Sequence, residues 1–378
     1  MARTLAHRPG HPGTRITAAR STAARTTAAL VTVAVAALTG CSAIGTDNTP
    51  KADASASSSG GGKVVLVTHD SFALSKDLIA QFEKDTGLTL EQRAPGDGGE
   101  LVNQLILTKD APLGDVVFGI DNTFASRAID EGVLEPYASP ALPAGADTYA
   151  VDGKSSLTPV DVGDVCLNVD HEWFAEKGLA EPTSFEDLAA PAYKDLLVVT
   201  NPATSSPGLA FLLATIAKFG EDGWKDYWTS LRANGLKVDA GWEDAYYSDF
   251  SGPSSEGDRP IVLSYASSPP YEVPDGGTTA PTGALLDTCF RQVEYAGVLA
   301  GAKNPEGARK VVDWLLSHDV QADIPESMYV YPVDASVALP ASWTTFAPQP
   351  AHPATLDPAV ITKNRDAWIQ QWTDVVIG

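Results

Sequence analysis

The feature that most constrains the fold is an alternation of apolar runs and amphipathic segments that begins at residue 63. The runs at 63–68 (KVVLVT), 88–92 and 115–119 (DVVFG) are short and rich in β-branched residues, as in strands buried on both faces. Between them, residues 76–85 and 100–108 carry apolar side chains at helical spacing. This order predicts a parallel sheet covered by helices, and therefore an α/β fold.

A second α/β unit is predicted further along the chain, with the same kinds of run. Its expected strands are residues 166–169, 196–199, 237–239 and 260–265. Its expected helices are residues 184–189, 207–219, 223–233 and 242–250, followed by helices at 306–317 and 358–376. A chain of 378 residues is long enough for two compact lobes.

Residues 1–40 have the layout of an export signal. Arginines without any acidic residue precede an apolar run at 28–38, which is too short to span a bilayer, since a span takes about 20 apolar residues. The run ends in the sequence LTGC, which resembles the lipobox of bacterial lipoproteins, where the signal is cut before a cysteine that receives the lipid. We predict lipidation of Cys41, and an ordinary signal peptide with a chance cysteine is the alternative.

Residues 41–62 are small, polar and rich in glycine, and they predict a flexible tether between the lipidated cysteine and the folded body. The lipid is expected to hold the protein on the outer face of the cell membrane. The chain has 48 Asp and Glu against 26 Lys and Arg, a formal net charge of −22. So acidic a chain excludes nucleic acid as a partner, because phosphate backbones bind through Lys and Arg.

Two cysteines remain in the body, Cys166 and Cys289, and both lie in strand-like runs. Outside the cytoplasm a pair of cysteines tends to be oxidised. The sequence therefore favours a disulfide between them, with two buried thiols in separate strands as the alternative.

Ligands of open α/β sheets bind beyond the carboxyl ends of the strands. Two serine–proline turns lie at such ends, Ser205-Ser206-Pro207 and Ser267-Ser268-Pro269, and each is expected to open a helix. Taken alone they are helix caps. At the ligand edge, their free backbone N–H groups and hydroxyls would also form a site for an anion.

Aromatic and acidic residues gather near these turns in the sequence. The aromatic residues are Trp242, Tyr246, Tyr247, Tyr265, Tyr271, Tyr329 and Tyr331. The acidic ones are Asp70, Asp97, Asp121, Glu243 and Asp244. Aromatic faces beside carboxylates suit an organic cation, whereas core packing and helix capping are the alternative roles.

Signatures of catalysis are absent from the sequence. It contains no G-x-S-x-G elbow, no H-E-x-x-H and no P-loop lysine, and its histidines are scattered. We therefore expect neither an enzyme nor a bound metal.

Several segments together resemble one family, the thiamine-binding proteins among the bacterial extracytoplasmic solute-binding proteins of ABC importers. The resemblance covers residues 63–378 and rests on segments that occur in the same order. They are THDSFA (68–73), GDGGELVNQL (96–105), DVVFGIDN (115–122), NPATSSPGLAFLL (201–213), GWEDAYYSDF (241–250), VLSYASSPPYE (262–272), QVEYAG (292–297), IPESMYVYPV (324–333) and RDAWIQQW (365–372).

The resemblance implies a class II periplasmic-binding-protein-like α/β fold with two lobes, joined by crossing strands with a ligand cleft between them. It places residues 63–159 and 294–324 in lobe 1, and residues 160–293 and 325–378 in lobe 2, with a third crossing near Ile324. It implies a monomer that uses no cofactor, captures thiamine or a thiamine phosphate and delivers it to an ABC permease in the membrane.

The resemblance also implies ligand-binding residues. They are Asp97, Gly98, Ser205, Ser206, Trp242, Tyr265, Ala266, Ser267, Ser268 and Pro269, with Asp70, Asp121, Tyr246 and Tyr329 as further candidates. The serines would hold the hydroxyethyl or phosphate end of the ligand at helix N-termini. Aromatic rings at 242, 265 and 329 would stack on the ligand's rings, and Asp97 would accept a hydrogen bond from the aminopyrimidine.

The chain departs from the family pattern at three positions, which bear on the preference among thiamine and its phosphates. Ala203 stands where the family has arginine, His69 where it has tyrosine, and Tyr329 where it has tryptophan.

Two other functions fit the same residues less well. A ferric-ion-binding protein of this fold would use adjacent tyrosines, here Tyr246 and Tyr247. A secreted hydrolase or lyase would need a paired nucleophile and base, which no sequence motif supplies.

Overall fold

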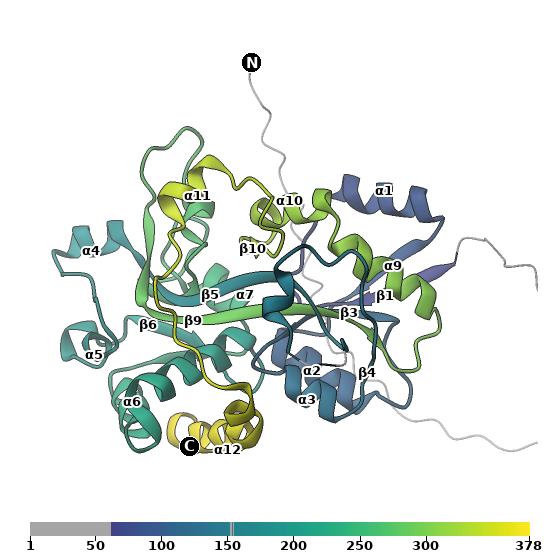
Figure 1. The fold of residues 1–378 in the computed structure, drawn as a ribbon. Coiled ribbons are helices and arrows are strands. Elements are labelled where there is room, and N and C mark those ends of the chain that lie inside the picture. The colour runs from purple at the N-terminus through teal and green to yellow at the C-terminus, as the bar shows by residue number, and fades with distance from the viewer. Residues whose placement is uncertain (1–61, 152, 154) are drawn as a thin grey trace, which may run out of the picture. The chain divides into compact units, whose positions relative to one another are not determined.

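The computed structural model of the protein describes residues 62–151, 153 and 155–378 (Figure 1). The predicted signal peptide, Cys41 and the tether as far as residue 61 lie outside the described residues. None of the helices in the described part is long and apolar enough to cross a lipid bilayer.

A single mixed sheet runs through the described residues, in the order β2-β1-β3-β9-β5-β8-β6-β7. At one end, β1 (Lys63–Val67) lies between β2 (Thr89–Arg93) and β3 (Val116–Asp121), and it pairs with both in parallel. All six residues of β3 are buried, as the continuous apolar run predicted. The predicted parallel arrangement of these three strands is therefore confirmed.

A second parallel group stands at the other end of the sheet. There β6 (Leu197–Thr200) pairs in parallel with β7 (Lys237–Asp239) and with β8 (Ile261–Tyr265).

Two long strands join the two parallel groups (Figure 1). They are β5 (Thr158–Asp170) and β9 (Thr282–Leu299), which pair with each other in antiparallel fashion. In turn β9 pairs with β3, and β5 pairs with β8. Short strands flank them: β10 (Tyr331–Pro332) on β5 and β4 (Leu134–Glu135) on β9. The predicted crossings at 159–160 and 293–294 fall within these strands.

The third predicted crossing, near Ile324, does not fall on a strand. Ile324 is a buried residue of α10 (His318–Ser327), a helix that carries Pro325. Its apolar side chain packs into the main core.

Helices around the first parallel group are α1 (Lys76–Thr86), α2 (Gly98–Leu107), α3 (Ala125–Asp130), α9 (Pro305–Leu315) and α10. The helix α9 packs on β1 and β3 through Val311, Val312 and Leu315, the apolar side that its spacing predicted.

Around the second group lie α4 (His171–Lys177), α5 (Phe185–Leu188), α6 (Ser206–Ala233), α7 (Trp242–Asp244), α8 (Pro269–Glu272), α11 (Ala341–Phe346) and α12 (Pro358–Val376). Short 3-10 turns occur at Ala146–Tyr149 and Pro191–Tyr193, and a π-helical turn at Ala245–Asp249 continues α7. The two helices predicted at 207–219 and 223–233 meet in α6 at Gly220, whose φ of 71° breaks the helical backbone.

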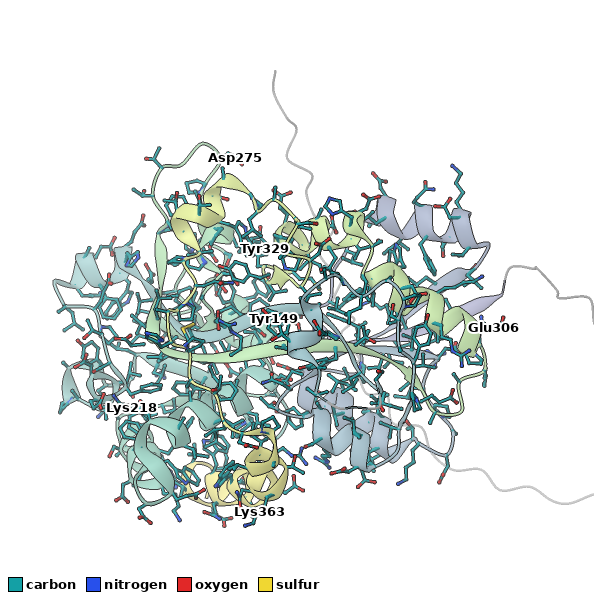
Figure 2. All side chains as sticks on the ribbon, in the orientation of Figure 1. Tyr149, Lys218, Asp275, Glu306, Tyr329 and Lys363 are labelled. Atoms are coloured by element: carbon teal, nitrogen blue, oxygen red, sulfur yellow. A yellow bond between two sulfur atoms is a disulfide. The ribbon has the colours of Figure 1, made fainter. Side chains whose placement is uncertain are left out.

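The helices α6 and α12 pack together through the rings of Trp228 and Trp372, whose centroids are 5.5 Å apart. Charged side chains such as Lys218, Glu306 and Lys363 point away from the core into solvent (Figure 2). The amphipathic helices thus bury their apolar sides and leave their charges exposed.

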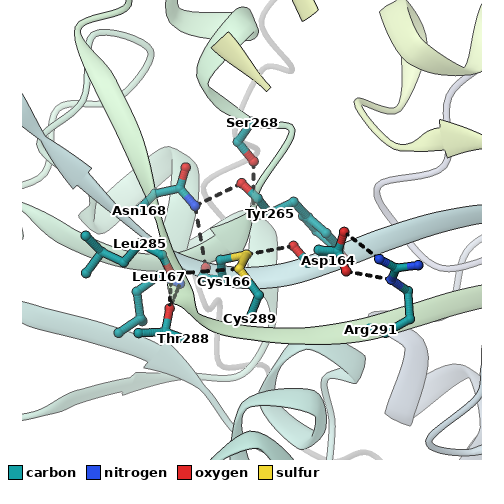
Figure 3. The surroundings of a disulfide bond; sticks show 10 residues. All are labelled: Asp164, Cys166, Leu167, Asn168, Tyr265, Ser268, Leu285, Thr288, Cys289 and Arg291. Carbon is teal, nitrogen blue, oxygen red and sulfur yellow. Dashed lines mark hydrogen bonds and ion pairs between the residues drawn. A yellow bond between two sulfur atoms is a disulfide. The ribbon is translucent and has the colours of Figure 1, made fainter. Parts of the chain in front are cut away.

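A disulfide joins Cys166 on β5 to Cys289 on β9 (Figure 3). Next to it, the Asp164 carboxylate accepts from the Arg291 guanidinium at 2.6 Å, and the Leu167 N–H donates to the Thr288 hydroxyl at 3.0 Å. The pairing register of the two strands shifts here, between Val165 and Leu167. The disulfide therefore ties the two long strands together where their backbone pairing is irregular.

Candidate ligand-binding site

A cleft opens where strand ends of both parallel groups approach the long strand β9. It encloses about 250 Å³ of empty space, part of it open to solvent. The lining residues come from the end of β1, the starts of α2, α6 and α7, the end of β8 and the middle of β9. They are His69, Ser71, Asp97, Gly98, Ser206, Pro207, Trp242, Tyr265, Gln292 and Glu294.

Asp97 is the polar centre of the cleft. Its carboxylate accepts hydrogen bonds from the backbone N–H groups of Gly98, Ser206 (3.2 Å) and Trp242 (2.9 Å). These groups lie at the starts of three helices, α2, α6 and α7, where free N–H groups favour an anion. Burial raises the pKa of the Asp97 carboxyl, and the Trp242 N–H opposes that rise.

The two serine hydroxyls of the first serine–proline turn have different surroundings. Ser205 is the N-cap of α6: its hydroxyl accepts from the Gly208 N–H at 3.3 Å and donates to Thr200 at 2.8 Å. The Ser206 hydroxyl lines the cleft, is buried, and has no hydrogen-bond partner among the described residues. A Cβ at Gly98 would lie 2.1 Å from that hydroxyl oxygen, so only glycine admits Ser206 here.

The second serine–proline turn does not bring its hydroxyls to the cleft. The Ser267 hydroxyl donates to the Tyr329 carbonyl at 2.6 Å, and the Ser268 hydroxyl shares a 2.7 Å bond with Ser264. Ala266 and Pro269 are buried and do not line the cleft either. Of the predicted segment 265–269, the cleft lining includes only Tyr265.

An aromatic wall, formed by Trp242 and Tyr265, borders the cleft. The Trp242 indole N–H donates to the Ser264 hydroxyl at 3.0 Å. Tyr246 stacks on Trp242 with ring centroids 4.9 Å apart, and its own hydroxyl donates to Glu272 at 2.9 Å. Burial raises the pKa of the Tyr246 phenol well above its usual value. Tyr246 therefore supports the wall from behind, without lining the cleft.

Tyr329 is absent from the residues that line the cleft. Its ring meets the ring of Tyr271 edge to face at 5.0 Å and stacks on Trp343 at 6.3 Å. Its φ of 56° is a left-handed value that non-glycine residues rarely adopt.

The floor of the cleft is acidic. In the register of the sheet, Glu294 of β9 lies opposite Asp121 of β3 and Asp161 of β5. Burial raises the pKa of Asp121 to about 7. Burial, and then the charge of Glu294, raise the pKa of Asp161 well above its usual range, which favours its protonated form. Asp70 is exposed and lies outside the lining.

His69 pairs with this floor. Its Nε2 lies 3.3 Å from Glu294 Oε1, and its Nδ1 lies 3.2 Å from the Ser71 hydroxyl. Burial alone would lower the pKa of the imidazole, but the Glu294 carboxylate outweighs burial, so the pKa is raised. The charge of Glu294 is therefore partly balanced by His69.

Gln292 and Glu294 are lining residues that the sequence analysis did not select. Pro207 and His69 also line the cleft, and the sequence analysis named them in the first serine–proline turn and as a departure from the family pattern, respectively. Gln292 and Glu294 both lie in QVEYAG, which belongs to the strand-like run that carries Cys289. Polar residues two apart in an apolar strand point to the same face, and that pattern was the signal available in the sequence.

The described residues contain no group of three or more His, Cys, Asp or Glu side chains placed to hold a metal ion. Tyr246 is buried, whereas Tyr247 is 38% exposed. Their rings meet edge to face at 5.4 Å. The two adjacent tyrosines therefore do not turn together into the cleft, as a tyrosine-based iron site would require.

Two groups of parallel strands are joined by two long strands, and a polar and aromatic cleft lies at the junction. This arrangement defines an α/β binding protein of the two-lobed periplasmic class. Among known proteins, the family described as bacterial extracellular solute-binding protein matches residues 111–350. The thiamine-binding periplasmic protein of Escherichia coli (strain K12) is 30% identical over 83% of this chain and 93% of its own length. The chain belongs to the bacterial extracellular solute-binding protein family.

Solved structures agree with this assignment. A periplasmic thiamin binding protein superimposes with a TM-score of 0.72 at 29% identity, over 83% of this chain and 96% of that one. Iron-bound HitA from Pseudomonas aeruginosa reaches a TM-score of 0.64 at 19% identity, over 83% of this chain and 99% of that one, and shares the fold alone. The fold class and family predicted from the sequence are confirmed.

Proposed function

We propose that this protein is the solute-binding subunit of an ABC importer, which captures thiamine in the cleft and delivers it to a membrane permease. The names of the relatives support this ligand. The Escherichia coli protein and the solved structure with a TM-score of 0.72 are both called thiamine-binding. The iron-binding relative is more distant in sequence.

The observation that carries the proposal is the combination of three surfaces in one cleft: an aromatic wall, an acidic floor and a helix N-terminus. Thiamine has two flat rings, one of them a permanent cation, and a hydroxyethyl tail. The rings of Trp242 and Tyr265 suit a flat organic cation, and Glu294 supplies a counter-charge. The Ser206 hydroxyl at the start of α6 suits the tail.

Thiamine phosphates are the second candidate ligands, because helix N-termini bind phosphate. The Ser206 and Trp242 N–H groups already donate to the Asp97 carboxylate. A phosphate would have to displace this carboxylate or share its donors. The unphosphorylated vitamin needs no such displacement.

Binding without catalysis is the role that the cleft supports, although Ser71, His69 and Glu294 form a chain that resembles a hydrolase triad. A general base must accept the proton of the serine hydroxyl. The Glu294 carboxylate raises the pKa of the His69 imidazole, which favours the protonated form that donates over the neutral form that accepts.

The same proposal includes the location of the protein. The LTGC sequence supports cleavage before Cys41, lipidation and attachment to the outer face of the cell membrane. A tether of about 20 residues would then keep a monomeric binding protein at high local concentration near its permease.

Calorimetric titration of thiamine, its monophosphate and its diphosphate into the ligand-free protein tests the proposal. We expect one-to-one binding of thiamine, weakened roughly 100-fold or more by Trp242→Ala because a stacking face is lost. Trp173→Ala, which removes a half-buried indole on α4 outside the cleft, is the matched control and should bind normally. A folded protein that gives no heat with any of the three ligands would refute the thiamine assignment.

A further inference from the structure

Gln292 has an unusual environment for a glutamine. Its side chain is 1% exposed, and neither Oε1 nor Nε2 finds a hydrogen-bond partner within the part of the chain that the structure describes. Buried amide groups are almost always hydrogen-bonded, because an unpaired one loses its water without compensation. Since Gln292 lines the cleft, the missing partner belongs to whatever fills the cleft.

The position of Gln292 on β9 determines what it can meet. It lies two residues before Glu294, so both side chains point to the cleft face of the strand. Across the sheet it pairs with Gly163 of β5. The ring of Tyr265 covers that glycine so closely that a Cβ there would lie 3.0 Å from the ring. Tyr265 and Gln292 therefore border the same part of the cleft.

The amide offers a specific chemical pattern. Its oxygen accepts, its nitrogen donates, and the two stand side by side. This matches a ring edge that carries an amino group next to a ring nitrogen, as when glutamine binds adenine in two places at once. A 4-aminopyrimidine has such an edge.

Asp97, which the sequence analysis assigned to the aminopyrimidine, is engaged elsewhere. Both of its carboxylate oxygens accept backbone N–H groups, from Gly98, Ser206 and Trp242. Within the described residues, the cleft-lining groups without a hydrogen-bond partner include the Gln292 amide and the Ser206 hydroxyl. Of these two groups, only the amide places an acceptor atom and a donor atom side by side.

We propose that Gln292 is the residue that recognises the aminopyrimidine edge of the ligand, through paired hydrogen bonds from its amide. This inference rests on the proposed function, because it takes thiamine as the ligand. It assigns selectivity for the pyrimidine to the crossing strand β9, and the binding of the tail to the helix starts.

A two-by-two calorimetric comparison tests the inference, with thiamine and its 4-deamino analogue as ligands and the wild type and Gln292→Met as proteins. Methionine keeps the size of the side chain and removes both hydrogen-bonding groups. We expect the wild type to prefer thiamine by roughly tenfold or more, about the value of one good hydrogen bond. Gln292→Met should bind the two ligands within about threefold of each other. A Gln292→Met protein that keeps the full preference for thiamine would overturn the inference.

A second measurement separates ligand recognition from a structural role. Gln321 is also fully buried, but its amide donates to the Val160 and Leu315 carbonyls and accepts from the Asp334 N–H. Without ligand, Gln321→Met should lower the melting temperature by several degrees, whereas Gln292→Met should leave it unchanged or raise it. A large drop for Gln292→Met would mean that the amide has a partner inside the protein.

The two failures can be told apart. If the wild type binds no thiamine, the proposed function fails, and the inference with it. If the wild type binds thiamine but Gln292→Met shows an undiminished preference, only the inference fails.

Discussion

Burial is the largest cause of the raised pKa values of the Asp121 and Asp161 carboxyls beneath the cleft. Asp121 has no exposed surface, and its carboxylate accepts from the Thr123 hydroxyl and the Phe124 N–H. Desolvation therefore raises the pKa of Asp121 from 3.8 to about 7. Asp161 and His69 share the same acidic surroundings around Glu294, and their pKa values are raised as well.

The raised pKa of Asp121 makes stability depend on pH. The folded protein holds the Asp121 proton more tightly than the unfolded chain does, so this contribution is complete below about pH 4 and is lost as the pH rises through about 7. Asp121→Asn removes it. The free energy of unfolding of the variant minus that of the wild type should rise by at most ~4 kcal/mol between pH 4 and pH 8. Urea denaturation of both proteins at each pH measures this difference.

The control for this prediction is Asp77→Asn, which removes one negative charge from an exposed position on α1. Its stability should follow the wild-type pH profile. Parallel profiles for Asp121→Asn and the wild type would contradict the role assigned to Asp121.

At the scale of elements, the short strands were predictable. The run 63–68 and the strand 237–239 reappear almost residue for residue as β1 and β7. The long strands β5 and β9 were only partly predicted, because their polar residues interrupt the apolar pattern at the cleft. Those residues include Gln292 and Glu294, whose roles depend on which face of the strand meets the other half of the sheet.

The site was predictable to a similar extent. Asp97, Gly98, Ser206, Trp242 and Tyr265 follow strands or open helices, and all of them line the cleft. Ser267 and Ser268 have the same local sequence pattern but bond inside the protein, because α8 is only four residues long and packs close to Tyr329. Local sequence determines a turn, whereas the direction of its hydroxyls depends on distant neighbours.

The disulfide between β5 and β9 gives a prediction about these elements. Replacing both Cys166 and Cys289 by alanine should lower the free energy of unfolding by ~2–4 kcal/mol, because the unfolded chain loses a cross-link over 123 residues. Urea denaturation measures the change. Dithiothreitol should destabilise the wild type and leave the double variant unaffected, and equal stability of the two proteins would rule out a stabilising bond.

At the scale of the whole molecule, the two sheet ends touch across the cleft. The Glu100 N–H donates to the Thr204 carbonyl at 2.9 Å, and the Asn103 amide reaches the Ala203 carbonyl at 3.4 Å. Glycine at position 99 permits this approach, because a Cβ there would lie 2.6 Å from the Thr204 backbone. The structure is therefore closed between α2 and the turn before α6.

Gly99→Ala should hold this contact apart. Gly99 does not line the cleft, yet we expect roughly tenfold weaker thiamine binding, because closure contributes to affinity. The radius of gyration from small-angle scattering should also be larger with ligand bound. Gly153→Ala is the matched control, because no atom of the described residues lies within 4 Å of a Cβ added there. Unchanged affinity and scattering would show that the turn adapts to the extra methyl group.

The Asp97 carboxylate, which bonds to the starts of α2, α6 and α7 at once, has a consequence for the speed of capture. A cleft that an internal side chain holds closed admits solute only during its openings. The rate of cleft opening, rather than diffusion, then limits binding. The observed association rate should level off at high solute concentration, at the rate with which Asp97 releases its hydrogen-bond partners.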